Sequence, residues 1–359
     1  MTGARNQHRF ALLTASATFL LIIAGGLVTS TGSGLSVPDW PTTYGHFMFA
    51  FPLDQMVGGI VFEHTHRMIA SVVGFLTVIL AIWIWKRDDR AWVKKLGLAA
   101  VFLVVAQGVL GGLTVLLLLP PAVSVAHAAL AQSFFAVVAS LALFTSSWWR
   151  SLEQHPGPAL KSAGAVRLTV VTAAAVFIQL LIGALMRHTD SGLAVPDFPL
   201  AYGQIIPSLS ASALQGYNDQ LLQSGIRIAA DGPVTAGQIA VHMIHRFWAV
   251  LVLLLVAWTS TSLARESVAS PRLRRFAFVL AALTLTQIAL GAFTVLSGKS
   301  VLITTAHVAT GALLLVFSVL ASLHTIGLRG VRQMPAPVLT PGSSRASGVA
   351  AGMARSATA

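Results

Sequence analysis

Residues 33–45 read SGLSVPDWPTTYG, and residues 191–203 read SGLAVPDFPLAYG. Nine of the thirteen positions are identical at an offset of 158 residues. A second match, at an offset of 180 residues, relates 107–116 (QGVLGGLTVL) to 287–296 (QIALGAFTVL). The chain therefore consists of two related halves, and the larger second offset places extra residues in a longer loop of the second half.

Long apolar segments surround these repeats. Hydrophobic residues make up 55% of the 359 residues and charged residues only 9%, whereas ordinary soluble domains carry about 25% charged residues. We read the apolar run that follows Arg5 and Arg9 as a retained first span, because no A-x-A cleavage pattern ends it. Eight segments are long enough to cross a hydrocarbon core of about 30 Å, and they lie near 10–30, 65–85, 96–118, 123–146, 165–186, 239–263, 276–297 and 301–325.

Basic residues gather on one side of these spans. Eighteen of the 23 lysines and arginines precede the first span or follow an even-numbered one, and the other five are Arg67, Arg187, Arg227, Arg246 and Lys299. The positive-inside rule places the basic side and both termini in the cytoplasm. We expect a multi-pass protein of the cell inner membrane. The net charge of +12 lies in short loops and the tail, which argues against nucleic-acid binding.

The expected fold is an all-α membrane protein with eight transmembrane helices, arranged as two four-helix bundles. Each half has an even number of spans, so the halves form a parallel repeat about an axis along the membrane normal. We expect an N-terminal half at 1–150, a C-terminal half at 151–330 and a disordered tail at 331–359, which is rich in Pro, Ser, Gly and Ala.

Four histidines occupy corresponding positions near the outer helix ends. His66 and His245 begin the second and sixth spans, and His127 and His307 begin the fourth and eighth. An ionisable residue within a span costs about 2.5–3.5 kcal/mol on insertion scales, so recurrence in both halves indicates a function. Imidazole is a common axial ligand of haem iron, and each half supplies one pair. Copper or zinc is the alternative, but zinc usually takes three or four protein ligands close together.

The charged neighbours of these histidines differ between the halves. Arg67 and Arg246 each follow a candidate ligand, where they either bind haem propionates or extend to lipid headgroups. Glu63 shares a helical face with His66, three residues on, whereas the second half has His242 at this position. This carboxylate either acts as an acid or base or orients a ligand. The difference predicts one reactive half and one electron-transfer half.

Other polar residues are expected to have structural roles. Asp39 and Asp197 lie in Pro-Asp-[Trp/Phe]-Pro segments, where they are expected to cap turns or short helices. The absence of cysteine excludes disulfides, thiolate metal sites and covalent c-type haem. We assign no ligand role to the remaining histidines, which are His8, His46, His64, His155, His188 and His324.

Together these features resemble the haem A synthase family. The resemblance covers roughly residues 10–326, including the parallel eight-span repeat and the Gly-Leu-x-Val-Pro-Asp-[Trp/Phe]-Pro loops. The residues that carry it are Glu63, His66 and Arg67 in one motif, His245 and Arg246 in the second half, His127 and His307.

The resemblance implies oxidation of the C8 methyl of haem O to the formyl group of haem A, through successive hydroxylations, for haem-copper oxidases. His66 and His127 would frame the substrate haem on the periplasmic side of the membrane. His245 and His307 would ligate a haem b, which carries electrons. Glu63 would be the catalytic carboxylate. Many family members carry a cysteine pair in the outer loops, so a mechanism that needs those thiols cannot operate in this chain.

The resemblance also implies partners for the two arginines and for the protein as a whole. Arg67 and Arg246 would contact propionates or shape the two sites. The chain would lie in membrane lipid and meet a haem O synthase transiently. Cytochrome oxidase assembly factors and an electron acceptor of unknown identity would be further partners. Whether the chain forms a homo-oligomer stays open.

Two other functions fit parts of the sequence. A di-haem b-type cytochrome would move electrons without changing a haem, and Glu63 argues mildly against it. A small-solute transporter with parallel repeats predicts polar groups and broken helices near the bilayer midplane, whereas the polar residues of this chain cluster at the outer helix ends.

Overall fold

The computed structural model describes residues 2–154, 160, 162–226, 232–268 and 270–330, so His155, Arg227 and the tail expected at 331–359 lie outside it. Regular secondary structure in this part is helical, with two isolated β-bridges and no strand. The long helices are α1 (Thr2–Ser30), α2 (Gly59–Arg87), α3 (Ala91–Leu116), α4 (Pro121–Thr145), α6 (Ala163–His188), α8 (Ala236–Arg265), α9 (Pro271–Leu296) and α10 (Val301–Gly330).

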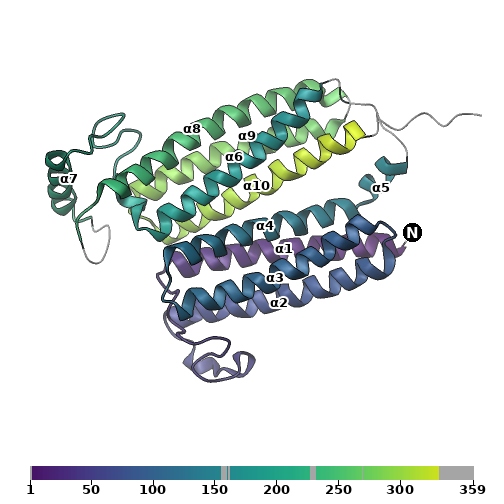
Figure 1. Cartoon of the computed structure of the whole chain (residues 1–359), viewed down its shortest axis with the longest axis horizontal. Helices are drawn as coiled ribbons and strands as arrows, with labels where there is room; N and C mark the ends of the chain where they lie inside the picture. The colour runs from purple at the N-terminus through teal and green to yellow at the C-terminus, as the bar shows by residue number, and fades with distance from the viewer. Residues whose placement is uncertain (1, 155–159, 161, 227–231, 269, 331–359) are drawn as a thin grey trace, which may run out of the picture.

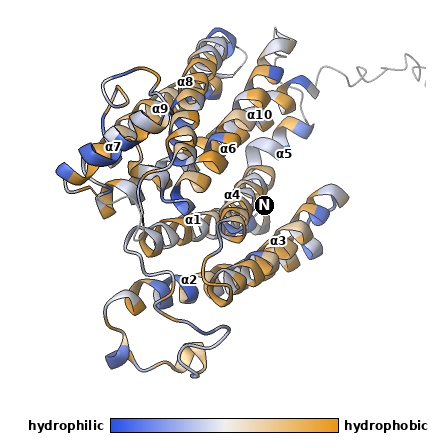
Figure 2. Cartoon of the chain, turned by 60° about the vertical axis from the view of Figure 1, so that its left-hand side comes forward, coloured by the Kyte–Doolittle hydropathy of each residue, from blue (hydrophilic) through white to orange (hydrophobic). Residues whose placement is uncertain are grey.

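These eight helices correspond to the eight expected spans. Each is long and apolar enough to cross a membrane, and hydrophobic residues predominate along them (Figure 2). Most helices extend beyond the apolar run, because backbone hydrogen bonding continues into flanking polar residues; α2 ends with Lys86 and Arg87, which suit the negative end of the helix dipole. In contrast, α3 ends two residues early, because Leu118 and Leu119 adopt left-handed backbone conformations.

The long helices pack as two rings of neighbours (Figure 1). In the first ring, α1 and α3 each pack against α2 and α4; in the second, α6 and α9 each pack against α8 and α10. Each ring encloses its own buried core, which includes Leu80 and Leu141 in the first and Val256 and Leu280 in the second. Contacts of α1 with α10, and of α4 with α6 and α10, join the rings along a seam.

Two short helices lie in connections between the long ones and were not expected from the sequence. They are α5 (Ser147–Gln154) and α7 (Ala211–Gln223). In α5, Trp149 and Leu152 are buried; in α7, Tyr217 and Leu221 are buried within a small loop core. A search for long apolar runs overlooks such helices, because only one face of each is apolar.

The loop end of the molecule is the end at which 31–58 and 189–235 emerge from the helices. Both of these loops contain the same aspartate-capped turn. Asp39 accepts hydrogen bonds from the backbone nitrogens of Tyr44 and Gly45, at 2.8 and 2.9 Å. Asp197 accepts two such bonds from its own turn, at 2.9 and 3.0 Å. The expected capping of turns by these two aspartates is confirmed.

Hydrogen bonding at this turn also affects the titration of Asp39. Partial burial acts to raise the pKa of its carboxyl, but hydrogen bonds from the Gly45 backbone, the Thr42 hydroxyl and the Tyr44 backbone outweigh it and lower the pKa from 3.8 to about 2. The charged form of Asp39 therefore stabilises the turn.

Candidate functional site

The four candidate histidines lie toward the loop end of α2, α4, α8 and α10. Each imidazole packs against a glycine of the preceding long helix. A methyl group at that glycine would lie only 3.0 or 3.1 Å from the imidazole Cε1, so glycine is what permits the contact. The four pairs are Gly25 with His66, Gly111 with His127, Gly183 with His245, and Gly291 with His307.

The histidines form one pair in each ring of helices. His66 and His127 are close enough for a charge on one to affect the other, and the same holds for His245 and His307. Each pair comes from opposite members of its ring, since α2 and α4 both pack on α1 and α3, and α8 and α10 both pack on α6 and α9. The structure therefore brings together two imidazoles in each half.

Three of these histidines also contact a glutamine one helical turn before the glycine. The Oε1 atom of each glutamine is buried and has no hydrogen-bond partner among the described residues. The distances from glutamine Nε2 to an imidazole nitrogen are 3.3 Å for Gln107 and His127, 3.2 Å for Gln179 and His245, and 3.3 Å for Gln287 and His307. At the fourth position, one turn before Gly25, the residue is Leu21.

Sequence reasoning missed these glycines and glutamines, although the signal was present. Gln107 and Gly111 recur as Gln287 and Gly291 within the second repeated segment. The role of a glycine cannot be inferred from a sequence until the side chain packed against it is known. A single glutamine in a span is compatible with several roles.

Glu63 and Arg67 hold the first loop. The Glu63 side chain is buried, with 3% of the residue exposed. Its carboxylate accepts hydrogen bonds from the Val37 backbone at 2.8 Å and from Arg67 at 2.7 Å. Arg67 also donates to the backbone carbonyls of Val37, Asp39 and Thr42. The Glu63 carboxylate is therefore bonded to Arg67 and the loop rather than to the imidazole of His66.

His242 and Arg246 hold the second loop at the equivalent positions. His242 is also buried, and its Nδ1 lies 3.0 Å from the carbonyl oxygen of Ser191. Arg246 donates to the carbonyls of Val195, Asp197 and Leu200. Of the two roles expected for Arg67 and Arg246, the geometry favours shaping the sites, because their terminal nitrogens already bond loop carbonyls.

Arg187 lies at the seam between the two rings. Its guanidinium donates to the Gly26 carbonyl at 3.1 Å and to the Ser30 hydroxyl at 2.7 Å, both on α1. It is close enough to His307 for their charges to interact. None of the ion pairs found among the described residues includes Arg187. This cation, near a histidine pair and without an acidic partner there, suits a ligand carboxylate.

Three of the histidines to which no ligand role was assigned, His8, His64 and His324, have local partners. His64 lies 3.1 Å from a loop threonine hydroxyl, and His8 lies 2.9 Å from a backbone carbonyl of α4. His324 contacts a serine hydroxyl at 3.2 Å and stacks on Trp148 with ring centroids 4.1 Å apart. These contacts are those of histidines that hold helices and loops together.

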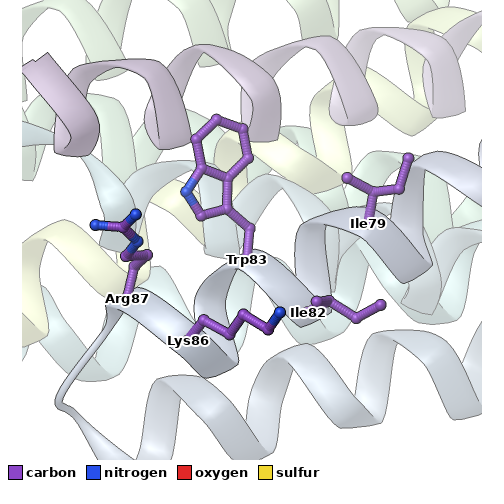
Figure 3. Close-up of a pocket in the computed structure, with 5 residues that line it drawn as sticks. All are labelled: Ile79, Ile82, Trp83, Lys86 and Arg87. Carbon is purple, nitrogen blue, oxygen red and sulfur yellow. The ribbon is translucent and has the colours of Figure 1, made fainter.

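A shallow cavity of about 320 Å³ lies near the far end of α2 (Figure 3). It is lined by Ile79, Ile82, Trp83, Lys86 and Arg87. Trp83 points toward α1, where its ring lies 5.6 Å from that of Phe10. Seventeen residues separate Trp83 from His66, or about 25 Å of helix. The cavity is therefore remote from the histidines and is not part of this site.

The residues at the site fit two haem groups, one in each half. Each half supplies two imidazoles and the glycines that leave room for them. His307 Nδ1 lies 3.1 Å from the Gln287 carbonyl oxygen, a contact that fixes the imidazole, and its Nε2 lies 3.3 Å from the Gln287 side-chain amide. No three His, Asp or Glu side chains in the described part gather into a metal-binding group, which disfavours the zinc alternative.

Comparison with known proteins agrees with a haem-related site. The model of the COX15-CtaA family, described as cytochrome oxidase assembly protein, matches residues 8–319, which include all four histidines. The chain is 28% identical to a heme A synthase of Halalkalibacterium halodurans over 308 residues, covering 84% of this chain and 91% of that one. A heme A synthase of Maricaulis maris is 28% identical over 352 residues, covering 90% and 97%.

Proposed function

The chain belongs to the COX15-CtaA family of cytochrome oxidase assembly proteins and has a role in haem A synthesis, and we propose that it oxidises the C8 methyl group of haem O to a formyl group. One observation carries the proposal. A duplicated scaffold presents two imidazole pairs, and only the first has a buried carboxylate, Glu63, where the second has His242. Equal scaffolds with unequal chemistry suit one substrate site and one electron-transfer site.

In this proposal His66 and His127 frame haem O, and His245 and His307 ligate a haem b. Haem b, when bound, supplies reversible one-electron transfer. The four glycine contacts hold the imidazoles, so each imidazole keeps its orientation. The contacts of α4 with both α6 and α10 support this proposal, because the two proposed sites would lie on adjoining helices with a short route for electrons.

We assign proton handling at the first site to Glu63. It lies one helical turn from His66, and its carboxylate is buried and held by Arg67 and the Val37 backbone. A carboxylate held in this way is pre-positioned, because it needs no reorganisation when a proton moves. Arg67 and Arg246 shape the sites by fixing the loops above them. Arg187, which bonds α1 and no loop carbonyl among the described residues, is the better candidate for a propionate.

The proposed membrane arrangement follows the same duplication. Residues 1–150 and 151–330 form parallel four-helix bundles about an axis along the membrane normal, with both termini cytoplasmic. The protein lies in the inner membrane with its haem sites toward the periplasm. The distribution of basic residues supports this orientation.

Several partners belong to this proposal. A haem O synthase supplies the substrate, cytochrome oxidase assembly factors receive the product, and a separate acceptor removes the electrons. The apolar farnesyl tail of haem O suits entry between helices from the lipid. The chain has no cysteine, so the reaction proposed here uses no thiol.

Haem analysis of cells that express the chain with and without a haem O synthase tests the proposal. Haem A should appear only when both proteins are present. Haem B alone in purified protein, even when haem O is supplied, would indicate the di-haem cytochrome instead. Protein that is free of haem despite an adequate supply would indicate the transporter.

A further inference from the structure

The cavity at the far end of α2 combines an apolar wall with two cations. Its lining residues are spaced three and four apart, so they share one face of the helix. The apolar residues Ile79, Ile82 and Trp83 lie within the span. The cations Lys86 and Arg87 are the last two residues of the helix (Figure 3). A phospholipid has the same order across a membrane, with acyl chains inside and a phosphate at the water boundary.

The two cations have no acidic partner in the described part of the chain. The ion pairs at this end of the helices use the carboxylates of Asp88 and Glu153, and their partners are other arginines. Lys86 and Arg87 are exposed, and no hydrogen bond or ion pair to another described residue, the exposed Asp89 included, occupies them. Two adjacent, unneutralised cations beside an apolar surface are complementary to a lipid phosphate.

Trp83 adds a hydrogen-bond donor between the apolar wall and the cations. Its ring packs against that of Phe10 on α1, with centroids 5.6 Å apart. The indole N–H groups of Trp149 and Trp248 donate within the protein, whereas that of Trp83 has no acceptor among the residues that the structure describes. The nitrogen faces the side on which Arg87 lies (Figure 3). Since a half-buried indole N–H usually finds an acceptor, an oxygen of a lipid headgroup suits this place.

The second half does not repeat this set of residues. An offset of 179 residues relates the histidine-arginine motifs of α2 and α8. It places Thr261 and Ser262 at the positions of Ile82 and Trp83, and it places Glu266 at the position of the second cation. The positive-inside rule accounts for cations at this end of both halves. It does not account for two adjacent cations beside an apolar wall in the first half alone.

We propose that this cavity binds one anionic phospholipid of the surrounding membrane. The phosphate lies between Lys86 and Arg87 and accepts the Trp83 indole hydrogen, and the acyl chains cover Ile79 and Ile82. The volume of about 320 Å³ is at the lower end of the range for ligand sites, about 300–1,000 Å³. It therefore takes the phosphate and the first part of the chains, while the rest stays in the bilayer. The proposal requires that α2 spans the membrane, and it does not depend on haem oxidation.

Native mass spectrometry of the purified full-length chain tests the inference. The protein in detergent is titrated with phosphatidylglycerol or with phosphatidylcholine that has the same acyl chains. The wild type should bind the first phosphatidylglycerol at least tenfold more tightly than phosphatidylcholine. The double variant Lys86→Gln, Arg87→Gln should lose about twentyfold to thirtyfold in this affinity, because each cation contributes about fivefold. The exchange Lys86→Arg, Arg87→Lys keeps both charges and should retain most of the binding.

The matched control is the double variant Arg274→Gln, Arg275→Gln. It removes two adjacent, exposed cations at the same end of the helices, on α9 and away from the cavity. It should bind phosphatidylglycerol as the wild type does. Equal losses in the two double variants would assign the binding to overall charge and overturn the inference. Equal affinity of the wild type for the two lipids would also overturn it.

Two further measurements test the apolar part of the site. Ile82→Thr introduces the residue of the second half and should weaken binding by about fourfold, the effect of one buried methylene group. This variant keeps both cations, so it also serves if the double variant at 86 and 87 does not fold. Inorganic phosphate at millimolar concentration should not displace the lipid. Displacement by phosphate, or unchanged binding in Ile82→Thr, would show a site for anions alone and contradict the proposal.

Discussion

The first and second halves hold their loops at the same place but with different chemistry. In the second half, Arg246 and His242 bond loop carbonyls. In the first half, Arg67 bonds loop carbonyls in the same way, but Glu63 adds a buried carboxylate with an ion pair. The shared contacts hold the loop against the helix in each half. The unshared residues mark where the two proposed sites differ in chemistry.

The seam between the halves repeats this pattern. Arg187 on α6 reaches across to α1, whereas the residue at the corresponding position of the first half, 158 residues earlier, is Thr29. The seam therefore contains one such arginine, whereas an exact repeat of the sequence would have placed a second arginine at position 29. Together with Glu63 and Leu21, Arg187 is a third place at which the two halves differ close to a histidine pair.

Removing Glu63 is expected to have the largest effect of any change at these unshared positions. Glu63→Gln keeps the size and one acceptor for the Val37 backbone but cannot take up a proton. We expect oxidation of haem O to fall by about a hundredfold or more, the range for loss of an acid–base group, while haem b content stays unchanged. Haem extraction and chromatography measure both quantities. Normal haem A production by Glu63→Gln would show that Glu63 only holds the loop and has no role in proton transfer.

Arg187 should show a smaller effect, confined to haem retention. Arg187→Ala removes the cation next to His307, and a hydrogen bond to a charged group contributes about 1.5–3 kcal/mol. The protein should therefore lose haem about tenfold faster or more in a transfer assay with an apo-globin acceptor. Arg187→Lys should recover part of the loss, because it keeps the charge. Unchanged retention in both variants would show that Arg187 only joins the helices.

The glycine contacts are shared, so equivalent substitutions should affect both halves equally. Gly111→Ala and Gly291→Ala each place a methyl group about 3 Å from an imidazole, and overpacking of this kind costs about 1–3 kcal/mol. Gly108→Ala is the matched control on α3, since no atom lies within 4 Å of its added methyl group. It should raise the stability of the helix by about 0.5–1 kcal/mol. Thermal unfolding of the three variants in detergent is followed by the haem absorption band. Unequal destabilisation by Gly111→Ala and Gly291→Ala would contradict the equivalence of the two halves at these contacts.

Asp39 is expected to give the smallest effect, and one that depends on pH. Its pKa is lowered in the folded protein, from 3.8 to about 2. The charged carboxylate therefore stabilises the fold above about pH 4, and this contribution is lost as the pH falls from about 4 to 2. Asp39→Asn should cost at most about 1 kcal/mol at pH 7, because the turn is largely solvated. The difference in Tm from the wild type should shrink below pH 4; a constant difference would contradict the assignment.

The sequence predicted the eight spans because length and apolarity alone define them. Helix ends were less accurate, since the polar residues that continue a helix carry no hydropathy signal. The short helices α5 and α7 were missed because only one face of each is apolar, which a search for long apolar runs overlooks. The two aspartate-capped turns were foreseen, because Asp39 and Asp197 lie in a repeated segment of Pro and Asp whose chemistry is local.

The candidate site was predictable as far as residue type reveals a role. His66, His127 and their counterparts, and Glu63, were selected because ionisable groups are costly in a span. The partners of Arg67 and Arg246 are backbone carbonyls, which every residue has, so sequence alone had no way to identify them. Gly111 and Gln107 acquired meaning only when the structure placed His127 against them.

The haem content of single histidine variants tests the division of roles most directly. His307→Ala and His127→Ala are made in otherwise identical chains, produced with a haem O synthase, and their haems are extracted and separated. We expect His307→Ala to lose haem B and to keep haem O, and His127→Ala to keep haem B and to lose haem O and haem A. Loss of the same haem from both variants would contradict the account, because the two halves would then share one role.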